Sequence, residues 1–240
     1  ENMSAVFFDE LGIPQPNYNL HVGSGSHGVQ TARIIEGVEQ VLMNAKAEGK
    51  PYDGMIVYGD TNSTLASSIA AVKIHIPVFH IEAGLRSFNM SMPEEVNRIV
   101  CDQLSSILFT PTLTGQNNLA QEGFAEGGIK QRVQFANGKG QKVVLSGDVM
   151  YDNSLYFSKI ADQKSDIIER LNLTERAYVL ATIHRPANTD NSTNLQSIFR
   201  ALLEIADSEQ IDIVLPLHPR TRKLLSTQLT PSLLDQIERC

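Results

Sequence analysis

Three carboxylates and four basic side chains in this sequence could together carry out acid–base chemistry on an anionic substrate. Asp60 and Glu82 each follow a short apolar run, and Glu94 lies at the start of a helical pattern. A carboxylate that acts as an acid or a base near neutral pH needs its pKa raised by burial or by a second carboxylate. Cations at a strand end suit a pyrophosphate, and the candidates are His184, Arg185, His218 and Arg220.

Each of these residues also has an ordinary structural interpretation. Asp60 could cap a helix that begins near residue 61. Glu82 could pair with Arg86 or Arg98, because carboxylates are seldom buried without a partner. Glu94 could form an i,i+4 pair with Arg98 on one helix face. The two histidines could be satisfied core residues, and the cations could form a solvated basic face.

The elements that must position these side chains alternate between strand and helix. Short β-rich runs are predicted at 19–22, 54–58, 77–81, 106–109, 141–145, 177–183 and 211–217. Helical patterns are predicted from the glycine-rich turn to about 49, at 61–76, 93–104, 112–122, 149–171 and about 191–207, and two further helices follow Pro219. This alternation predicts βαβ units and a parallel sheet. In open α/β sheets, ligands bind beyond the carboxyl ends of the strands. Five predicted strand ends carry titratable or phosphate-binding groups, which favours a site there over chance.

The domain organisation is predicted as two Rossmann-like units. Residues 1–158 form an N-terminal domain, 159–172 a linking helix, and 173–240 a partial C-terminal nucleotide-binding domain. Only two strands are predicted after the linking helix, so the second domain looks incomplete. Residues 123–140 are rich in glycine and predict a surface loop.

The composition excludes several classes of protein. The 240 residues are 42% hydrophobic and 20% charged, which is ordinary for a soluble globular protein. The net charge of −7 and the lack of a basic stripe argue against a nucleic-acid partner. No apolar run approaches the roughly 18–20 residues of a membrane helix, and no signal peptide is visible. Two cysteines form neither a disulfide framework nor a metal-ligand spacing, so we expect a cytoplasmic protein.

One motif suggests a different cofactor. Gly23, Gly25 and Gly28 form a literal G-x-G-x-x-G before a helix, the spacing of a dinucleotide-binding turn. That fingerprint expects an acidic residue about 20 positions on, at the end of the next strand. Here the point falls near Lys46, inside a long helical pattern. We prefer the interpretation that these glycines let the helix pack near a strand. The alternative is an NAD-dependent dehydrogenase, which saturable binding of NAD would support.

Six motifs together resemble one enzyme family. Residues 57–64, 80–87 and 92–98 read Val-Tyr-Gly-Asp-Thr-Asn-Ser-Thr, His-Ile-Glu-Ala-Gly-Leu-Arg-Ser and Met-Pro-Glu-Glu-Val-Asn-Arg. Together with 147–152, 182–188 and 216–221, they resemble the signature of non-hydrolysing UDP-N-acetylglucosamine 2-epimerases. Residues 86–89 are more similar to the branch that acts on UDP-2,3-diacetamido glucuronic acid. The resemblance covers essentially the whole chain.

The resemblance implies a GT-B-like fold, with two Rossmann-like domains facing a cleft, and a homodimer. Such relatives open with a strand and a Gly-Thr-Arg-Pro-like loop that touches the nucleotide sugar, and they end with strands that hold the uridine and ribose. Neither segment is found in these residues. We therefore expect a fragment of a longer protein, with the second domain incomplete.

The resemblance also implies a mechanism without cofactor or metal. A base removes the C2 proton while UDP leaves C1, and the 2-acetamidoglucal then takes a proton on its other face and UDP adds back. Asp60, Glu82 and Glu94 match acid–base or orienting positions, and His184 would sit near the phosphates. The spacing of Arg98 suggests that it fixes Glu94 or the substrate. Arg185, His218 and Arg220 are the further substrate-binding candidates.

The alternative is a GT-B-fold glycosyltransferase or a catalytically inactive nucleotide-sugar sensor. Either would bind a UDP-sugar, or transfer its sugar, without exchanging the C2 hydrogen. Three carboxylates around C2 argue against this alternative, because glycosyl transfer does not need them.

Overall fold

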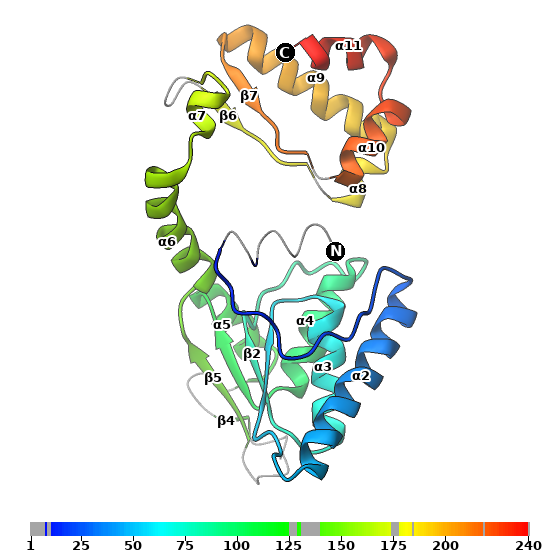
Figure 1. Cartoon of the computed structure of the whole chain (residues 1–240), viewed down its shortest axis with the longest axis vertical. Coiled ribbons are helices and arrows are strands. Elements are labelled where there is room, and N and C mark those ends of the chain that lie inside the picture. Colours follow the sequence, from blue (N-terminus) through cyan, green and yellow to red (C-terminus); the bar gives the residue numbers. More distant parts are fainter. Residues whose placement is uncertain are drawn as a thin grey trace. The chain divides into compact units, whose positions relative to one another are not determined.

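The computed structural model describes residues 8, 11–124, 129–130, 140–173, 178–183, 185–217 and 219–239. The chain divides into two compact units, Glu1–Ser154 and Leu155–Cys240. Figure 1 labels most of the helices and strands of the two units. No helix in these described ranges combines the length and the apolar character that crossing a membrane requires.

The first unit is built on a five-stranded sheet. Its strand order is β1-β2-β3-β5-β4, with β1 at Met55–Tyr58, β2 at Val78–Ile81, β3 at Ile107–Thr110, β5 at Gln141–Leu145 and β4 at Ile129–Lys130. The pairs β1–β2, β2–β3 and β3–β5 are parallel, and only β4 runs antiparallel to its neighbour. The expected parallel α/β sheet is confirmed. Because the four parallel strands share one direction, their carboxyl ends lie at the same edge.

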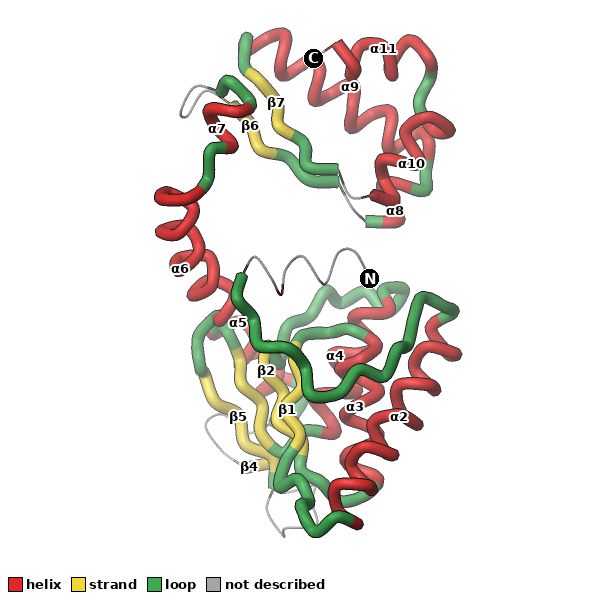
Figure 2. The backbone as a smooth tube through the Cα atoms, in the orientation of Figure 1, coloured by secondary structure: helices red, strands yellow, loops and turns green. Residues whose placement is uncertain are grey.

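Four helices pack in this unit: α2 (His27–Ala47), which precedes β1, and α3 (Asn62–Lys73), α4 (Pro93–Leu104) and α5 (Leu113–Gln121), which follow β1, β2 and β3. Helix α3 packs between α2 and α4 (Figure 2). Three alanines let it pack closely, because Ala66, Ala70 and Ala71 are fully buried. Helix α4 begins with Pro93, whose missing N–H has no partner to lose in the first helical turn.

Two apolar clusters hold the helices against the sheet. Leu42, Val57, Ala71 and Val78 join α2, β1, α3 and β2. Ala83, Leu108, Leu119, Phe124 and Val143 form the second cluster, around β3, β5 and α5. The sheet whose carboxyl edge carries the candidate residues therefore has a packed apolar core.

The second unit contains a two-stranded parallel sheet, as its sequence predicted. Strand β6 (Tyr178–Leu180) pairs with β7 (Asp212–Val214). The helices are α7 (Ile167–Arg170), α8 (Pro186–Thr189), α9 (Ser192–Glu209), α10 (Pro219–Gln228) and α11 (Pro231–Arg239). The core consists of Ile183, Leu195, Phe199, Leu225, Leu229 and Leu233. Helix α6 (Val149–Lys164) contains the boundary between the two units.

Three expected elements differ from the structure. Residues 19–22 form no strand, because the Asn19 Oδ1 accepts a hydrogen bond from the His21 N–H (2.8 Å) and His21 adopts a positive φ of 51°. The long helix expected at 149–171 is broken into α6 and α7, since Ser165 and Asp166 leave the helical path. Strand β4 lies within residues 123–140, where the glycine content predicted only a loop.

Candidate active site

Asp60 lies in the turn that follows β1. Gly59 has a φ of +68°, and its N–H donates to the Ile81 carbonyl (3.1 Å), which joins this turn to β2. The hydroxyl of Thr61, not the carboxylate of Asp60, caps α3 by accepting from the Thr64 N–H (3.4 Å). The capping interpretation of Asp60 is therefore wrong, and its side chain, 36% exposed, is left available for other contacts.

Arg98 of α4 orients Asp60. The Arg98 Nη1 donates to the Asp60 Oδ2 at 2.6 Å. On the neighbouring residue of the helix, the Asn97 amide donates to the Asp60 backbone carbonyl at 2.8 Å. Charge-assisted hydrogen bonds to carboxylates are short and directional. Helix α4 therefore fixes both the main chain and the side chain of Asp60.

Glu82 lies at the end of β2 with a φ of +75°, which is unusual for a residue with a side chain. It is partly buried, and among the described residues it makes no hydrogen bond or ion pair. The expected pair with Arg86 or Arg98 does not form. Burial raises the pKa of Glu82, and the negative charges of Asp60 and Asp148 raise it further.

Asp60 and Glu82 lie close together across the ends of β1 and β2. A Cβ added to Gly59 would lie 3.4 Å from the Glu82 Oε2, so the Glu82 carboxylate reaches the turn that carries Asp60. The electrostatic effect of Asp60 on Glu82 agrees with this proximity. The two carboxylates have different surroundings, since Asp60 is bound by a guanidinium and Glu82 has no such partner within the described residues.

Glu94 is exposed at the start of α4 and makes no ion pair in the part of the chain that the structure describes. Its expected i,i+4 partner, Arg98, binds Asp60 and Glu95 instead. Arg98 therefore fixes Asp60 and not Glu94. Within the described residues, no hydrogen bond or ion pair joins Glu94 to Asp60 or Glu82, and its catalytic role stays a prediction.

Glu95 is a buried carboxylate that sequence analysis missed. Only 1% of the residue is exposed. Its oxygens accept from the backbone N–H groups of Ser87 (2.9 Å) and Phe88 (2.8 Å) and from the guanidinium of Arg98. Burial alone would raise the pKa of Glu95, but these donors lower it below its ordinary value. Glu95 therefore ties the loop after Glu82 to α4, and only the i,i+3 spacing to Arg98 hinted at this.

The substitution Glu95→Gln is expected to lower the free energy of unfolding at pH 7 by about 2–3 kcal/mol, because a buried carboxylate acceptor is lost. Since the folded-state pKa of Glu95 is lowered, its stabilisation is present above the unfolded pKa and disappears as the pH falls through the folded pKa. Denaturant titrations should therefore show the gap to wild type narrowing below about pH 4.5. The matched control is Glu94→Gln, one residue away and exposed, expected to change stability by less than about 0.5 kcal/mol. A gap that persists unchanged at pH 3 contradicts the account.

A second missed carboxylate, Asp148, follows β5. Its Oδ1 accepts from the N–H groups of Met150 (2.9 Å) and Tyr151 (3.3 Å) at the start of α6. Its charge raises the pKa of both Glu82 and Tyr58. The Ser-Gly-Asp run at the strand end could suggest a helix cap. Only the fold shows that the charge of Asp148 acts on Glu82.

The glycine-rich turn does not act as expected from its sequence. A Cβ added to Gly23, Gly25 or Gly28 would meet nothing within 4 Å, so these glycines do not permit close packing of a helix on a strand. The turn is instead tied to the start of α3, where the Asn62 amide contacts the His27 Nδ1 (3.1 Å) and the Gln30 Oε1 (2.7 Å).

The basic candidates of the second unit are only partly described. His184 and His218 lie outside the described residues. Arg185 is exposed near the start of α8, and its carbonyl accepts from the Asn188 and Thr189 N–H groups. Arg220 forms an ion pair with Asp190, with 2.7 Å from its Nη2 to each carboxylate oxygen. The substrate-binding role of all four residues stays a prediction.

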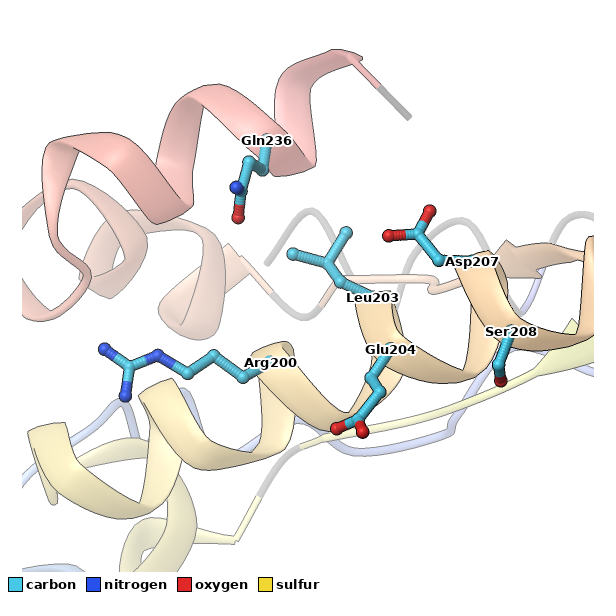
Figure 3. Close-up of a pocket in the computed structure, with 6 residues that line it drawn as sticks. All are labelled: Arg200, Leu203, Glu204, Asp207, Ser208 and Gln236. Atoms are coloured by element: carbon cyan, nitrogen blue, oxygen red, sulfur yellow. The ribbon is translucent and has the colours of Figure 1, made fainter.

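The described residues offer no metal site, and a pocket in the second unit does not involve the predicted site residues. The described residues contain no group of three or more His, Cys, Asp or Glu that could hold a metal ion. A pocket of about 480 Å³ lies between α9 and α11 (Figure 3). None of the predicted site residues is among those that line it, which are Arg200, Leu203, Glu204, Asp207, Ser208 and Gln236.

Comparison with known proteins places the chain among nucleotide-sugar epimerases. A model of the family described as UDP-N-acetylglucosamine 2-epimerase matches residues 1–239. The chain is 45% identical over 224 residues to a UDP-N-acetylglucosamine 2-epimerase homolog of Methanococcus maripaludis, covering 93% of this chain and 56% of that protein. It is equally 45% identical over 224 residues to a UDP-2,3-diacetamido-2,3-dideoxy-D-glucuronate 2-epimerase of Pseudomonas aeruginosa, covering 93% and 57%.

Solved structures agree. The UDP-GlcNAc 2-epimerase of Methanocaldococcus jannaschii, in complex with UDP-GlcNAc and UDP, superposes with a TM-score of 0.79 at 38% identity, covering 98% of this chain and 59% of that one. The enzyme of Neisseria meningitidis bound to UDP-GlcNAc gives a TM-score of 0.76 at 30% identity, covering 96% and 59%. The chain has the GT-B-like α/β fold and spans a little over half the length of these relatives. Its sequence and its fold together show that it belongs to the UDP-N-acetylglucosamine 2-epimerase family.

Proposed function

We propose that the protein containing this chain is a non-hydrolysing nucleotide-sugar 2-epimerase that interconverts UDP-GlcNAc and UDP-ManNAc, or a diacetamido-uronic acid analogue. The observation that carries the proposal is Glu82. It is a partly buried carboxylate with a raised pKa, and it lies beside a second carboxylate, Asp60, that Arg98 holds in place. Pairs of titratable groups in different surroundings are the arrangement that acid–base catalysis needs.

The chemistry of the sugar explains why two such groups are required. The C2–H bond lies next to no carbonyl, so a base alone could not form a free carbanion there. When a base takes the C2 proton, the electron pair of that bond forms the C1=C2 double bond, and the C1–O bond breaks with its electrons leaving on UDP. Return of a proton to the opposite face of C2, and of UDP to C1, gives the epimer. Proton transfer on both faces therefore needs at least two acid–base groups.

The raised pKa of Glu82 makes its carboxylate a better proton acceptor than an ordinary glutamate, which a base at C2 needs to be. The carboxylate of Asp60, bound to Arg98, is the second group in the proposal. Glu94 is retained as a third acid–base or orienting group, on the strength of the family resemblance. His184, Arg185, His218 and Arg220 are proposed to contact the pyrophosphate.

The remaining proposals rest on the resemblance and on the relatives. The relatives that match this chain at 45% identity carry both substrate names, so the two UDP-sugars are the candidates. We also propose a cytoplasmic homodimer with no cofactor. Residues 1–158 and 173–240 would form the two Rossmann-like domains, joined by residues 159–172.

Proton NMR of the complete protein in heavy water tests the function. With either UDP-sugar as substrate, deuterium is expected at C2, together with traces of the glucal and free UDP. Epimer formation without deuterium at C2 contradicts elimination. Sugar transfer to an acceptor, or binding without any exchange, favours the glycosyltransferase or sensor alternative.

A further inference from the structure

A fully buried histidine supports the turn that carries Asp60. His80 is the third residue of β2, and none of its surface is exposed. Its Nε2 lies 2.9 Å from the Gly59 carbonyl oxygen, and its Nδ1 lies 2.7 Å from the Asp102 Oδ1. Since carbonyl and carboxylate oxygens only accept hydrogen bonds, the Nε2 donates to Gly59 and the Nδ1 donates to Asp102.

Asp102 of α4, also fully buried, supports the turn that carries Glu82. Its Oδ2 accepts from the Gly84 N–H (3.1 Å) and from the Arg86 Nη2 (2.7 Å). Arg86 in turn donates to Glu122, from its Nε (2.6 Å) and its Nη2 (2.8 Å). One carboxylate therefore reaches both turns, the second directly and the first through His80.

One residue of these turns, Glu82, has a backbone conformation that needs such support, whereas the two glycines adopt positive φ without steric cost. Gly59, Glu82 and Gly84 all have positive φ, at 68°, 75° and 79°. Such conformations cost about 1–3 kcal/mol for a residue with a side chain, and they persist only where the surroundings over-determine them. The buried side chains of His80 and Asp102 supply that constraint, because they bind the Gly59 carbonyl, next to Asp60, and the Gly84 N–H, two residues after Glu82.

We propose that His80 and Asp102 are positioning residues that hold the carboxylates of Asp60 and Glu82 in the relative position needed for proton transfer. The proposal rests on the proposed 2-epimerase function. Neither residue has exposed surface. Each acts through a backbone atom, the Gly59 carbonyl for His80 and the Gly84 N–H for Asp102. A misplacement of about 1 Å at a reacting group can lower a rate on the order of 100-fold. Loss of this support should therefore lower kcat substantially.

Two substitutions of His80 separate positioning from simple stability. The amide nitrogen of glutamine can occupy the place of Nε2, so His80→Gln keeps a donor to the Gly59 carbonyl and loses the bond to Asp102. The amide of asparagine can occupy the place of Nδ1, so His80→Asn keeps the bond to Asp102 and loses the donor to Gly59. Each variant loses one buried hydrogen bond, and similar melting temperatures are expected.

In the complete protein, His80→Asn is expected to lower kcat for C2 deuterium exchange on the order of 10- to 100-fold, with KM within about threefold of wild type. His80→Gln is expected to keep a kcat at least about tenfold above that of His80→Asn. Equal kcat values for the two variants, a kcat that follows the melting temperature, or an effect on KM alone would overturn the proposal.

A measurement on the wild type covers the cases in which the variants fail to fold or the enzyme shows no exchange. In the complete protein labelled with 15N-histidine, one imidazole Nε2–H is expected to be protected from solvent and to show a nuclear Overhauser contact to the Asp60 amide. Its absence would overturn the positioning of Asp60 by His80. Wild-type protein that shows this contact but no C2 exchange would overturn the proposed function and leave the positioning geometry supported.

Discussion

Replacing Glu82 by glutamine is expected to lower the rate of C2 deuterium exchange in the complete protein on the order of 100- to 10,000-fold. Glutamine has nearly the same shape as glutamate but cannot take up or release a proton. Because Glu82 makes no hydrogen bond or ion pair in the described parts of the chain, the substitution removes no contact that holds the fold. Deuterium exchange followed by proton NMR, with KM measured alongside, checks the result.

The free energy of unfolding of the variant distinguishes a loss of catalysis from a loss of folded protein. The folded-state pKa of Glu82 is raised, so its stability contribution is present below the unfolded pKa and is lost as the pH rises through the folded pKa. Above the folded-state pKa the ionised carboxylate therefore weakens the fold, and Glu82→Gln should not lower the free energy of unfolding there. The control Glu204→Gln changes an exposed carboxylate of α9 and should leave exchange unaffected. A Glu82→Gln protein that exchanges at the wild-type rate would remove Glu82 from the mechanism.

The same carboxylate should control the pH dependence of the reaction. The negative charge of Asp148 helps to raise the pKa of Glu82, so Asp148→Asn should move the acid limb of the kcat profile to lower pH. Asparagine keeps the Oδ1 that caps α6, so the charge is the main change. A pH–rate profile of both proteins measures this, and an unmoved acid limb would show that Glu82 does not set it.

Gly84→Ala is expected to lower the free energy of unfolding by about 4 kcal/mol. A Cβ at this position would lie 2.4 Å from the Gly115 carbonyl oxygen at the start of α5, and the backbone φ is +79°. Overpacking against rigid backbone contributes about 2–3 kcal/mol, and the left-handed conformation contributes about 1–2 kcal/mol. Since the Gly84 N–H binds Asp102, the displaced turn should also carry Glu82 out of place.

Gly123→Ala is the matched control for this prediction. Gly123 also has a positive φ, of 88°, but an added Cβ would meet nothing within 4 Å. This variant should lose only the conformational part, about 1–2 kcal/mol. Denaturant titrations of the two variants measure the difference. Equal losses would show that the contact with Gly115 is not limiting, because the turn or α5 can move.

The second unit shows how far local patterns reach. Its two strands and the helices around them follow the predicted ranges within a few residues, because apolar periodicity is a local property of the sequence. The break between α6 and α7 and the missing strand at 19–22 depend on single polar residues such as Asn19, whose side chain competes for a backbone N–H. Propensity over a window does not detect such competition.

The sequence by itself determined most of the strands and helices, the parallel arrangement of the main strands, the family motifs and the placement of Asp60 and Glu82 at the ends of two successive strands. These follow from local patterns together with the rule that parallel strands end at one edge of the sheet. The tertiary structure decided the partners. Arg98 could have reached Glu94 or Glu95 along one helix, and only the fold, which brings Asp60 and the loop after Glu82 to α4, selected Asp60 and Glu95. The contact of His80 with Asp102 joins residues 22 positions apart in different elements, and no local pattern encodes such a distance.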